Sequence, residues 1–361
     1  MKSMLILLVA CIAPAAFAGT TNVHCVNSSE KLANALALLS TSAANTDADE
    51  IRIHTGAYSA PEGGWVGSVT THHALTVRGG YTDEGDTCTQ QTLDASMTVL
   101  NGNDTSGVMT INTPLGPDSD IEVSGLTFQH GKGGGAFGPN AGGLKIGDPG
   151  PISNGKILVE RNIFRDNSSV SDGFSQAIGG LLAATDGQSL IVRGNLFVNN
   201  TSPNAAAFLY SNNAIDVSNN TFAGNRSTDS AQIPVALDYF TFGGLFSTNN
   251  IYWDNAIGSG QFDIDLSAHL NGAKGATLVH DDIQTSTGTA VSATGTMQAD
   301  PKFVGTGDFR LSVASTLIDA GVDDPSGGLA EVDLDGAPRI DAATADLGAY
   351  ESSYVFIDGF E

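Results

Sequence analysis

Basic residues are scarce in this chain of 361 residues, which has 15 Lys plus Arg against 39 Asp plus Glu and a net charge of −24. A surface so poor in positive charge does not attract phosphate backbones or anionic lipid headgroups. The balance therefore excludes nucleic-acid binding and argues against electrostatic binding to membranes. Charged residues of both signs make up only 15% of the chain and hydrophobic residues 41%, so a charge-driven disordered chain is excluded as well.

Long hydrophobic runs are missing beyond the N-terminus. Residues 5–16 are apolar, follow Lys2, and lead into the small-residue pattern Ala-Phe-Ala before Gly19. This arrangement is typical of a cleaved secretory signal peptide and is too short to span a bilayer. We therefore expect a signal peptide at residues 1–18 and no transmembrane segment in the mature chain. The predicted location is secreted, either extracellular, at the cell surface or in the periplasm.

Cysteine is rare, and only Cys25 and Cys88 remain once the signal peptide is removed. In an oxidising compartment an even pair of cysteines favours one disulfide. The bridge would tie the mature N-terminus to a segment far along the chain. Two unpaired thiols are the alternative.

A repeat of about 25 to 35 residues is the strongest pattern in the chain. In its frame an aliphatic residue is followed by Asn five positions later, by an aromatic residue at seven and by a second Asn at ten. Four blocks fit, beginning at Ile157, Leu190, Ile215 and Leu245, and the segment around Phe128 fits without the asparagines. Units of this size cannot bury an apolar face alone, so they must stack on one another.

The repeat predicts an all-β fold, a single-stranded right-handed parallel β-helix of about nine to eleven coils. Alternating aliphatic residues such as Ile157 and Val159 mark a short strand with one face inward. The unit is too short for a propeller blade and lacks the periods of helical and leucine-rich solenoids. Because Asn tolerates left-handed backbone angles, the asparagines are expected at the corners as an amide ladder, beside an internal ring stack. The ladder and stack residues are Asn162, Asn195, Asn220 and Asn250, with Phe164, Phe197, Phe222 and Tyr252.

Two further motifs resemble those of known families. Gly-Gly-Leu at 142–144, 179–181 and 243–245, together with Phe-x-x-Asn in three blocks, resembles the repeats of polymorphic outer membrane proteins. The combination is also similar to that of secreted right-handed parallel β-helices with the pectin-lyase fold. The run from Asp300 to Glu351 resembles the C-terminal signature of secreted bacterial β-helix proteins of the choice-of-anchor group. These resemblances imply the fold and say little about activity.

The expected organisation has five parts. An N-terminal helix with Leu32, Ala35, Leu36 and Leu39 on one face is expected to cover the first coil. The parts are a signal peptide (1–18), an N-terminal cap with this helix (19–45), the parallel β-helix (46–320), a C-terminal cap motif (321–351) and a short tail (352–361).

Calcium is the one cofactor that the sequence suggests. Asp333-x-Asp335-Gly matches half of a calcium loop, and Asp346 and Glu351 could supply further oxygens, but the regular series of ligands is absent. The alternative is that these acids pair with Arg339 and complete the cap. No cofactor is then required.

No catalytic residue is predicted. Lys and Arg are absent from residues 227–273, and the motifs of polygalacturonases and pectate lyases do not occur. Elimination needs a base and hydrolysis needs clustered carboxylates. We therefore favour a non-catalytic binding or structural role toward a glycan or a surface partner, with a polysaccharide lyase or glycoside hydrolase as the alternative.

The candidates for a sugar-binding strip are aromatic and acidic residues at the edges of the repeats. They are Asp238, Tyr239, Trp253 and Asp254. The sequence does not determine the oligomeric state.

Overall fold

The computed structural model describes residues 21–40, 48–69, 74–83, 85, 87–113, 120–134, 140–147, 155–170, 177–187, 189–229, 234–255, 262–267, 273–341 and 343–352. The predicted signal peptide and nearly all of the predicted tail lie outside the described residues. No helix in this part of the chain is long and apolar enough to cross a membrane.

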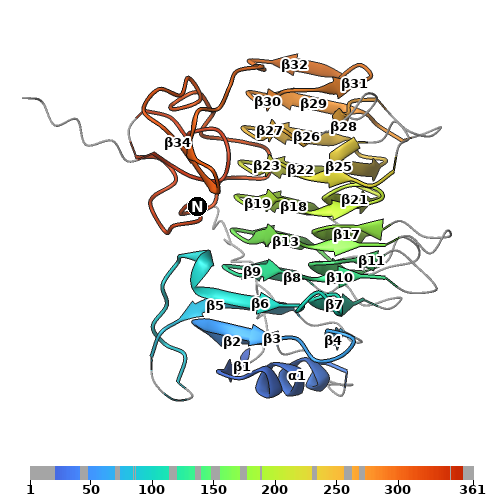
Figure 1. The fold of residues 1–361 in the computed structure, drawn as a ribbon, viewed down its shortest axis with the longest axis vertical. Coiled ribbons are helices and arrows are strands. Elements are labelled where there is room, and N and C mark those ends of the chain that lie inside the picture. Colours follow the sequence, from blue (N-terminus) through green and yellow to red (C-terminus); the bar gives the residue numbers. More distant parts are fainter. Residues whose placement is uncertain are drawn as a thin grey trace, which may run out of the picture.

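Three long parallel sheets form the faces of one continuous coil (Figure 1). The chain passes from a strand of the first sheet to the second and then to the third, and returns to the first sheet one layer further along. Within the described residues it completes eight such turns, fewer than the nine to eleven predicted, preceded by β1 (Thr21–Val26) and followed by β32 (Ser292–Thr294). The predicted fold, an all-β right-handed parallel β-helix, is confirmed.

The first sheet has ten strands: β1, β2 (Ala48–His54), β5 (Leu75–Tyr81), β8 (Ile121–Ser124), β13 (Ile157–Glu160), β18 (Leu190–Arg193), β22 (Ile215–Ser218), β26 (Leu245–Thr248), β29 (Ala276–Val279) and β32. The second sheet consists of β3 (Gly56–Ser59), β6 (Thr98–Asn101), β9 (Thr127–Gln129), β14 (Ile163–Arg165), β19 (Leu196–Val198), β23 (Thr221–Ala223), β27 (Ile251–Trp253) and β30 (Asp282–Ile283).

The third sheet consists of β4 (Trp65–Ser68), β7 (Met109–Asn112), β12 (Leu144–Ile146), β17 (Leu181–Thr185), β21 (Ala207–Ser211), β25 (Pro234–Thr241), β28 (Phe262–Asp265) and β31 (Ser286–Thr287). A small fourth sheet contains β10 (Lys132–Gly133), β15 (Ser168–Ser169), β20 (Thr201–Ser202) and β24 (Arg226–Ser227). The remaining elements are the parallel pair β11 (Asn140–Ala141) and β16 (Ala177–Ile178), the antiparallel pair β33 (Phe303–Gly305) and β34 (Asp308–Leu311), helix α1 (Ser29–Leu38) and the short 3-10 helix η1 (Ala95–Met97).

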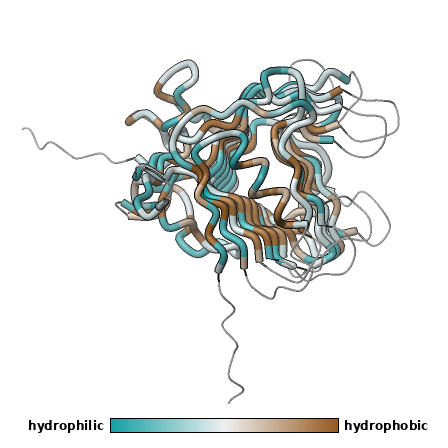
Figure 2. The backbone as a smooth tube through the Cα atoms, turned by 90° about the horizontal axis from the view of Figure 1, so that it is seen from below, coloured by the Kyte–Doolittle hydropathy of each residue, from teal (hydrophilic) through white to brown (hydrophobic). Residues whose placement is uncertain are grey.

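Register places the repeated aromatic residues beside one another. Phe164 pairs with Phe197, Phe197 with Phe222, and Phe222 with Tyr252. Their rings are nearly parallel, with centroids 4.8, 4.5 and 5.0 Å apart, and all are buried. Phe128 extends the stack at 5.1 Å from Phe164. The predicted internal stack is therefore confirmed, and hydrophobic residues recur at the same place in successive layers (Figure 2).

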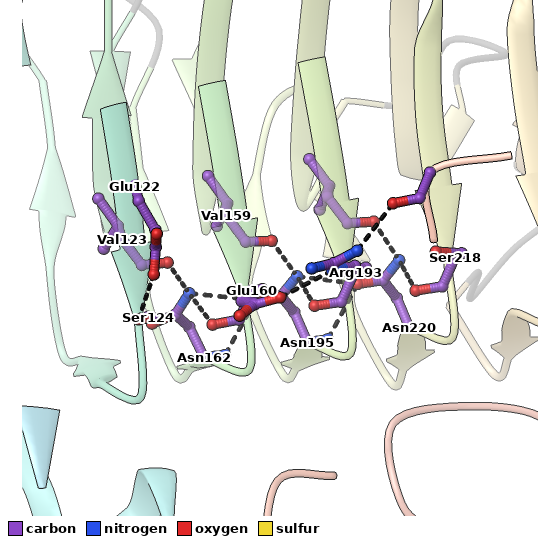
Figure 3. A network of polar contacts seen from close by, with 12 residues as sticks. Glu122, Val123, Ser124, Val159, Glu160, Asn162, Arg193, Asn195, Ser218 and Asn220 are labelled. Carbon is purple, nitrogen blue, oxygen red and sulfur yellow. Dashed lines mark hydrogen bonds and ion pairs between the residues drawn. The ribbon is translucent and has the colours of Figure 1, made fainter. Parts of the chain in front are cut away.

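An asparagine ladder fills the corner between the first and second sheets (Figure 3). The backbone N and Nδ2 of Asn162 donate to Oδ1 of Asn195 at 2.9 and 3.2 Å, and Asn195 donates in the same way to Asn220, at 2.9 Å for both. Each Nδ2 also donates to backbone carbonyls. The predicted ladder is confirmed, and Asn250 is its fourth rung.

The asparagines at the tenth position of the repeat form a second ladder, between the second and fourth sheets: Asn167, Asn200, Asn225 and Asn255. In both ladders the left-handed backbone angle belongs to the residue before the asparagine, as at Asn219 with φ +52° and Asn199 with φ +54°. The expectation that the ladder residues themselves take this angle is wrong. Because each amide must point inward to meet the next rung, the preceding residue makes the bend.

Helix α1 covers the first layer of the coil (Figure 1). It begins after Ser28, whose hydroxyl accepts from the backbone N of Lys31 at 3.2 Å. The face predicted from the sequence is buried, with Leu32 and Leu36 fully inaccessible to solvent. Trp65 of β4 lies against the helix and donates from Nε1 to the carbonyl of Ser29 at 3.2 Å.

The first strand comes earlier than the sequence predicts. β1 pairs in parallel with β2 and adds a layer before α1, so the described part of the coil begins at Thr21 and not at residue 46. Only Val26 of this strand is buried, which explains why alternation gives no signal there. Cys25 of β1 forms the predicted disulfide with Cys88, with a Cα–Cα distance of 5.6 Å.

Residues 300–341 and 343–352, which we call the C-terminal segment, lie along the side of the coil and not over its end (Figure 1). Asn219 donates from Nδ2 to the carbonyl of Asp346 at 3.1 Å, and the backbone N of Ala349 donates to Oγ1 of Thr221 at 3.0 Å. These coil residues belong to middle layers. The expected cap at 321–351 is therefore a side cover, and the strands of the coil end at Thr294 and not at residue 320.

The side cover forms because the second sheet is apolar on its outer face as well. Ile163 and Leu196 point away from the coil interior and pack with Leu334 and Ala349 of the C-terminal segment. A sheet with two apolar faces must be covered on both to keep them from water.

Candidate functional site

The four residues predicted to form a sugar-binding strip do not share one surface. Strand β25 alternates, so that Leu237 and Tyr239 point into the core while Asp238 and Phe240 face outward. Tyr239 is only 2% exposed. The prediction that Tyr239 binds a ligand is therefore wrong, because it falls on the inward parity of its strand.

Trp253 and Asp254 lie on a different side of the molecule from Asp238. Trp253 ends β27 of the second sheet and packs with Leu311 and Leu317 of the C-terminal segment. Asp254 takes the left-handed corner after this strand, with φ +53°, and its backbone N donates to Gln284 at 2.7 Å. The structure thus leaves only Asp238 on the outer face of the third sheet.

Aromatic residues recur at the outward positions of β21 and β25 and directly after β25, and we call Phe208, Tyr210, Phe240 and Phe242 the aromatic face, of which Phe208 is buried. Tyr210 pairs in register with Phe240, and their rings are parallel within 8° with centroids 5.5 Å apart. Phe242 meets Phe240 edge to face at 5.1 Å and is 43% exposed. Tyr210 and Phe240 are half-buried, so each presents part of its ring to solvent.

The aromatic face continues into an apolar strip on the neighbouring layers. Phe208 packs with Leu182 and Ala184 of β17 and with Ile178 of β16, all buried. The strip therefore crosses several coils at a right angle to the strands. The residues of this strip are covered from solvent, so the exposed part of the aromatic face is limited to Tyr210, Phe240 and Phe242, and this part marks a candidate binding surface.

Polar groups surround the aromatic face. Tyr210 donates from its hydroxyl to Oδ1 of Asn212 at 3.2 Å, and Asn212 donates to Asp186 at 2.6 Å. Burial, with the nearby charge of Asp186, raises the pKa of the Tyr210 phenol, which therefore remains protonated. Asp238 lies beside Phe208 in the register. The surface combines flat rings with hydrogen-bonding groups at its rim.

A second pattern in the sequence predicts which residues of the third sheet face outward, although it does not belong to the repeat of asparagines and aromatic residues. The strands of the third sheet at 181–185, 207–211 and 237–241 end in Thr185, Ser211 and Thr241 at equivalent positions. Aligning them on these hydroxyl residues assigns the inward and outward parity of every residue between. That alignment would have selected Phe240 in place of Tyr239.

Three of the four calcium candidates surround a buried arginine. Asp333 accepts backbone N–H groups at both oxygens, from Asp335 and Ala337 at one and from Glu351 at the other. Oε2 of Glu351 accepts from the backbone N of Asp346 at 3.1 Å and lies 3.5 Å from the guanidinium of Arg339. Asp335 points away and pairs with Arg310 at 2.6 Å.

The Arg339 guanidinium lies among these acids and supplies the positive charge that a bound calcium ion would otherwise supply. Arg339 is 3% exposed and donates to the carbonyl of Asp346 at 2.6 Å. Burial raises the pKa of Glu351 to about 7, so part of the acidic charge is removed by protonation near neutral pH. These residues fit an internal cation better than a hydrated calcium ion, which needs six to eight oxygen ligands.

We expect calcium to leave the melting temperature unchanged. A ligand that binds only the folded state raises stability by mass action, so an occupied site would show a shift between millimolar calcium and excess chelator. The measurement is thermal unfolding under both conditions, with magnesium as the control for ionic strength. A calcium-specific rise would show that these acids bind the ion after all.

Both asparagine ladders end on a buried aspartate. Asn250 donates from its backbone N and Nδ2 to Oδ1 of Asp281 at 2.8 and 3.0 Å, and Asn255 donates to Asp263 at 2.7 Å. Both carboxyl groups are inaccessible to solvent. Burial raises the pKa of Asp281 to about 7 and also raises that of Asp263. Without access to solvent these acids cannot act on a substrate.

A cleft brings the carboxylate of Asp166 and the guanidinium of Arg165 together. It has a volume of about 230 Å³ and lies between the second sheet and the C-terminal segment, where Arg165, Asp166, Phe309 and Tyr350 line it. Asp166 is already paired with Arg165 at 3.1 Å. Hydrolysis of a glycosidic bond requires two carboxyl groups facing the bond, and this cleft supplies one.

Comparison of the sequence with protein-family models and with curated proteins finds no match. The geometry of the aromatic face is therefore the feature that bears on function.

Proposed function

We propose that this protein is an exported β-helix that binds a neutral polysaccharide through the aromatic face. The observation that carries the proposal is the parallel pair Tyr210 and Phe240, whose centroids are 5.5 Å apart on the outer side of the third sheet. The rings stand on rigid strands of consecutive layers. Their positions are therefore fixed before a ligand arrives, which lowers the entropic cost of binding.

Flat rings with a polar rim match the chemistry of a sugar chain. One face of a pyranose ring carries C–H groups that pack on an aromatic ring, and its hydroxyl groups need hydrogen-bonding partners at the edge. Asn212, Asp186 and Asp238 provide amide and carboxylate groups beside the rings. Because Tyr210 and Phe240 stack on each other, a sugar would pack against the outward edges of this pair and against Phe242 beside it.

The charge of the protein selects among polysaccharides. A net charge of −24 repels a polyuronate, so a neutral or amino-substituted glycan is favoured. The alternative, a lyase or hydrolase, gains no support from the cleft at Arg165 and Asp166, where a single carboxylate is already engaged. Binding without cleavage is therefore the function that we propose.

We also propose that the chain is related to the secreted β-helices with the pectin-lyase fold. The N-terminal signal-peptide pattern, the disulfide between Cys25 and Cys88, the Gly-Gly-Leu and Phe-x-x-Asn repeats and the motif from Asp300 to Glu351 support this relation. Export would place the aromatic face outside the cytoplasm, where polysaccharides are present.

The double variant Tyr210→Ala and Phe240→Ala is expected to weaken binding to a neutral polysaccharide at least about tenfold, since loss of two stacking rings removes more than about 1.4 kcal/mol. The measurement is co-sedimentation with insoluble glucans, xylans and chitin and affinity electrophoresis with soluble ones. Phe246→Ala, which removes a half-buried ring from the outer face of the first sheet, is the matched control. Unchanged binding by the double variant, or no binding of the wild-type protein to any glycan of the panel, contradicts the proposal.

A further inference from the structure

The two ends of the coil are finished differently. Helix α1 covers the first layer, whereas β31 and β32 form the last edges of the third and first sheets. All three residues of β32 are exposed. Within the described residues no further strand pairs with these edges, so one side of each carries backbone N–H and C=O groups that a new strand could pair with.

A hollow of about 690 Å³ opens at the same end. Leu278, Ile283, Ala293 and Met297 are among the residues that line it. Ala293 pairs in register with Leu278, which points to the interior, so its side chain faces the space that a following coil would fill. Nearby, Val291 is 70% exposed. The apolar interior of the solenoid thus reaches the surface here.

Among the described residues, this end lacks the features with which proteins usually protect exposed strand edges. From Ile283 to Ala299 the sequence contains no charged residue and no proline. Edge lysines, edge prolines and covering helices normally prevent pairing between molecules. On a chain with a net charge of −24, an uncharged stretch of this length is also where two copies repel each other least.

We propose that this end binds a second copy of the chain, last layer against last layer. Head-to-tail stacking is blocked because α1 occupies the first layer and turns the exposed residues Glu30 and Asn34 outward. The remaining contact uses the same surface on both copies, which closes after two chains and cannot grow into a fibre. A two-fold axis would pair β32 with its copy in antiparallel orientation and bring the two hollows together.

The test is the mass of the purified full chain by light scattering and sedimentation over a wide range of micromolar concentrations. We expect twice the mass of one chain. The double variant Ala293→Lys and Thr296→Lys places like charges across the contact and should weaken association at least about tenfold. Added lysines reduce the net negative charge of each chain. If only the net charge mattered, the double variant would therefore associate more strongly than the wild-type chain. Val313→Lys, on the C-terminal segment and 76% exposed, is the matched control and should stay dimeric.

Hydrogen exchange keeps the proposal testable if the double variant does not fold. In the wild-type chain, protection of the amides of β32 should rise with protein concentration, while protection in β18 should not change. A monomer at every concentration overturns the proposal, as does a double variant that folds and remains dimeric. Faster exchange at β32 in a monomer after deletion of residues 353–361 would also overturn it, because the tail of the same chain would then cover this end.

Discussion

Replacement of Asn195 by alanine is expected to lower the free energy of unfolding by about 3 to 5 kcal/mol. Asn195 is fully buried and joins two neighbouring rungs. Without its side chain, the backbone N of Asn162 loses its acceptor, Nδ2 of Asn162 keeps only its bonds to backbone carbonyls, and the carbonyl of Val159 loses a donor. Each buried polar group left without a partner costs about 1 to 3 kcal/mol. The cavity left by the amide adds to this loss.

Denaturant unfolding of the wild-type and variant chains measures this difference. Asn199→Gly is the matched control, because Asn199 is exposed, has φ +54° and its side chain donates a long bond of 3.4 Å to Asp166. The control should change stability by less than about 1 kcal/mol, since glycine adopts this backbone angle without strain. Equal effects of the two substitutions would mean that the ladder contributes little beyond local turn geometry.

Asp281→Asn is expected to stabilise the protein by about 2 to 4 kcal/mol at pH 8. The carboxyl of Asp281 ends a ladder of asparagines, and its Oδ2 is buried with no hydrogen-bond partner. Asparagine keeps the acceptor that Asn250 uses and adds a donor where the other rungs have one. Burial raises the pKa of Asp281 from 3.8 to about 7, and a tenfold change in an equilibrium constant is worth about 1.4 kcal/mol.

The stabilisation by Asp281→Asn should increase as the pH rises. The pKa of Asp281 is higher in the folded than in the unfolded chain, so the folded state binds more protons between about pH 4 and pH 7. Its contribution to stability is therefore complete below about pH 4 and is lost as the pH rises through about 7. Asp282 and Glu351, with pKa values raised to about 6 and about 7, change stability in the same direction. The wild-type protein should be more stable at pH 5 than at pH 8.

Unfolding by denaturant at pH 5 and pH 8 measures both effects. The difference between Asp281→Asn and the wild-type chain should be smaller at pH 5 than at pH 8. Asp254→Asn makes the same change of charge at an exposed corner and should give no such difference. A gain of equal size at both pH values would show that hydrogen bonding alone, and not the ionisation of Asp281, causes it.

The repeat frame predicted the interior of the protein because identical layers impose identical surroundings. Phe164, Phe197 and Phe222 recur at one position of the frame and therefore stack, and the same holds for Asn162 and Asn195. Parallel register converts a period in the sequence into a column in space. For this reason the fold and the ladders could be predicted from residue spacing alone.

The residues on the outer surface of the coil do not recur with the period of the repeat. Tyr239 and Phe240 are adjacent aromatic residues, and only the parity of β25 decides which of them faces solvent. Likewise, the packing of Leu334 and Ala349 against Ile163 depends on how the chain turns back after its last strand. Contacts between segments so distant in sequence carry no local pattern, and the side cover was therefore predicted as an end cap.

The position of the C-terminal segment changes how the molecule must assemble. In an ordinary solenoid each layer touches only its neighbours, so layers can add one after another from either end. Here Arg193 bonds to the carbonyl of Gly327 and Thr221 to the backbone of Ala349, across 134 and 128 residues. Layers formed early in synthesis thus acquire these partners only after Gly327 and Ala349 have been synthesised. Such long separations slow folding and couple distant layers into one cooperative unit.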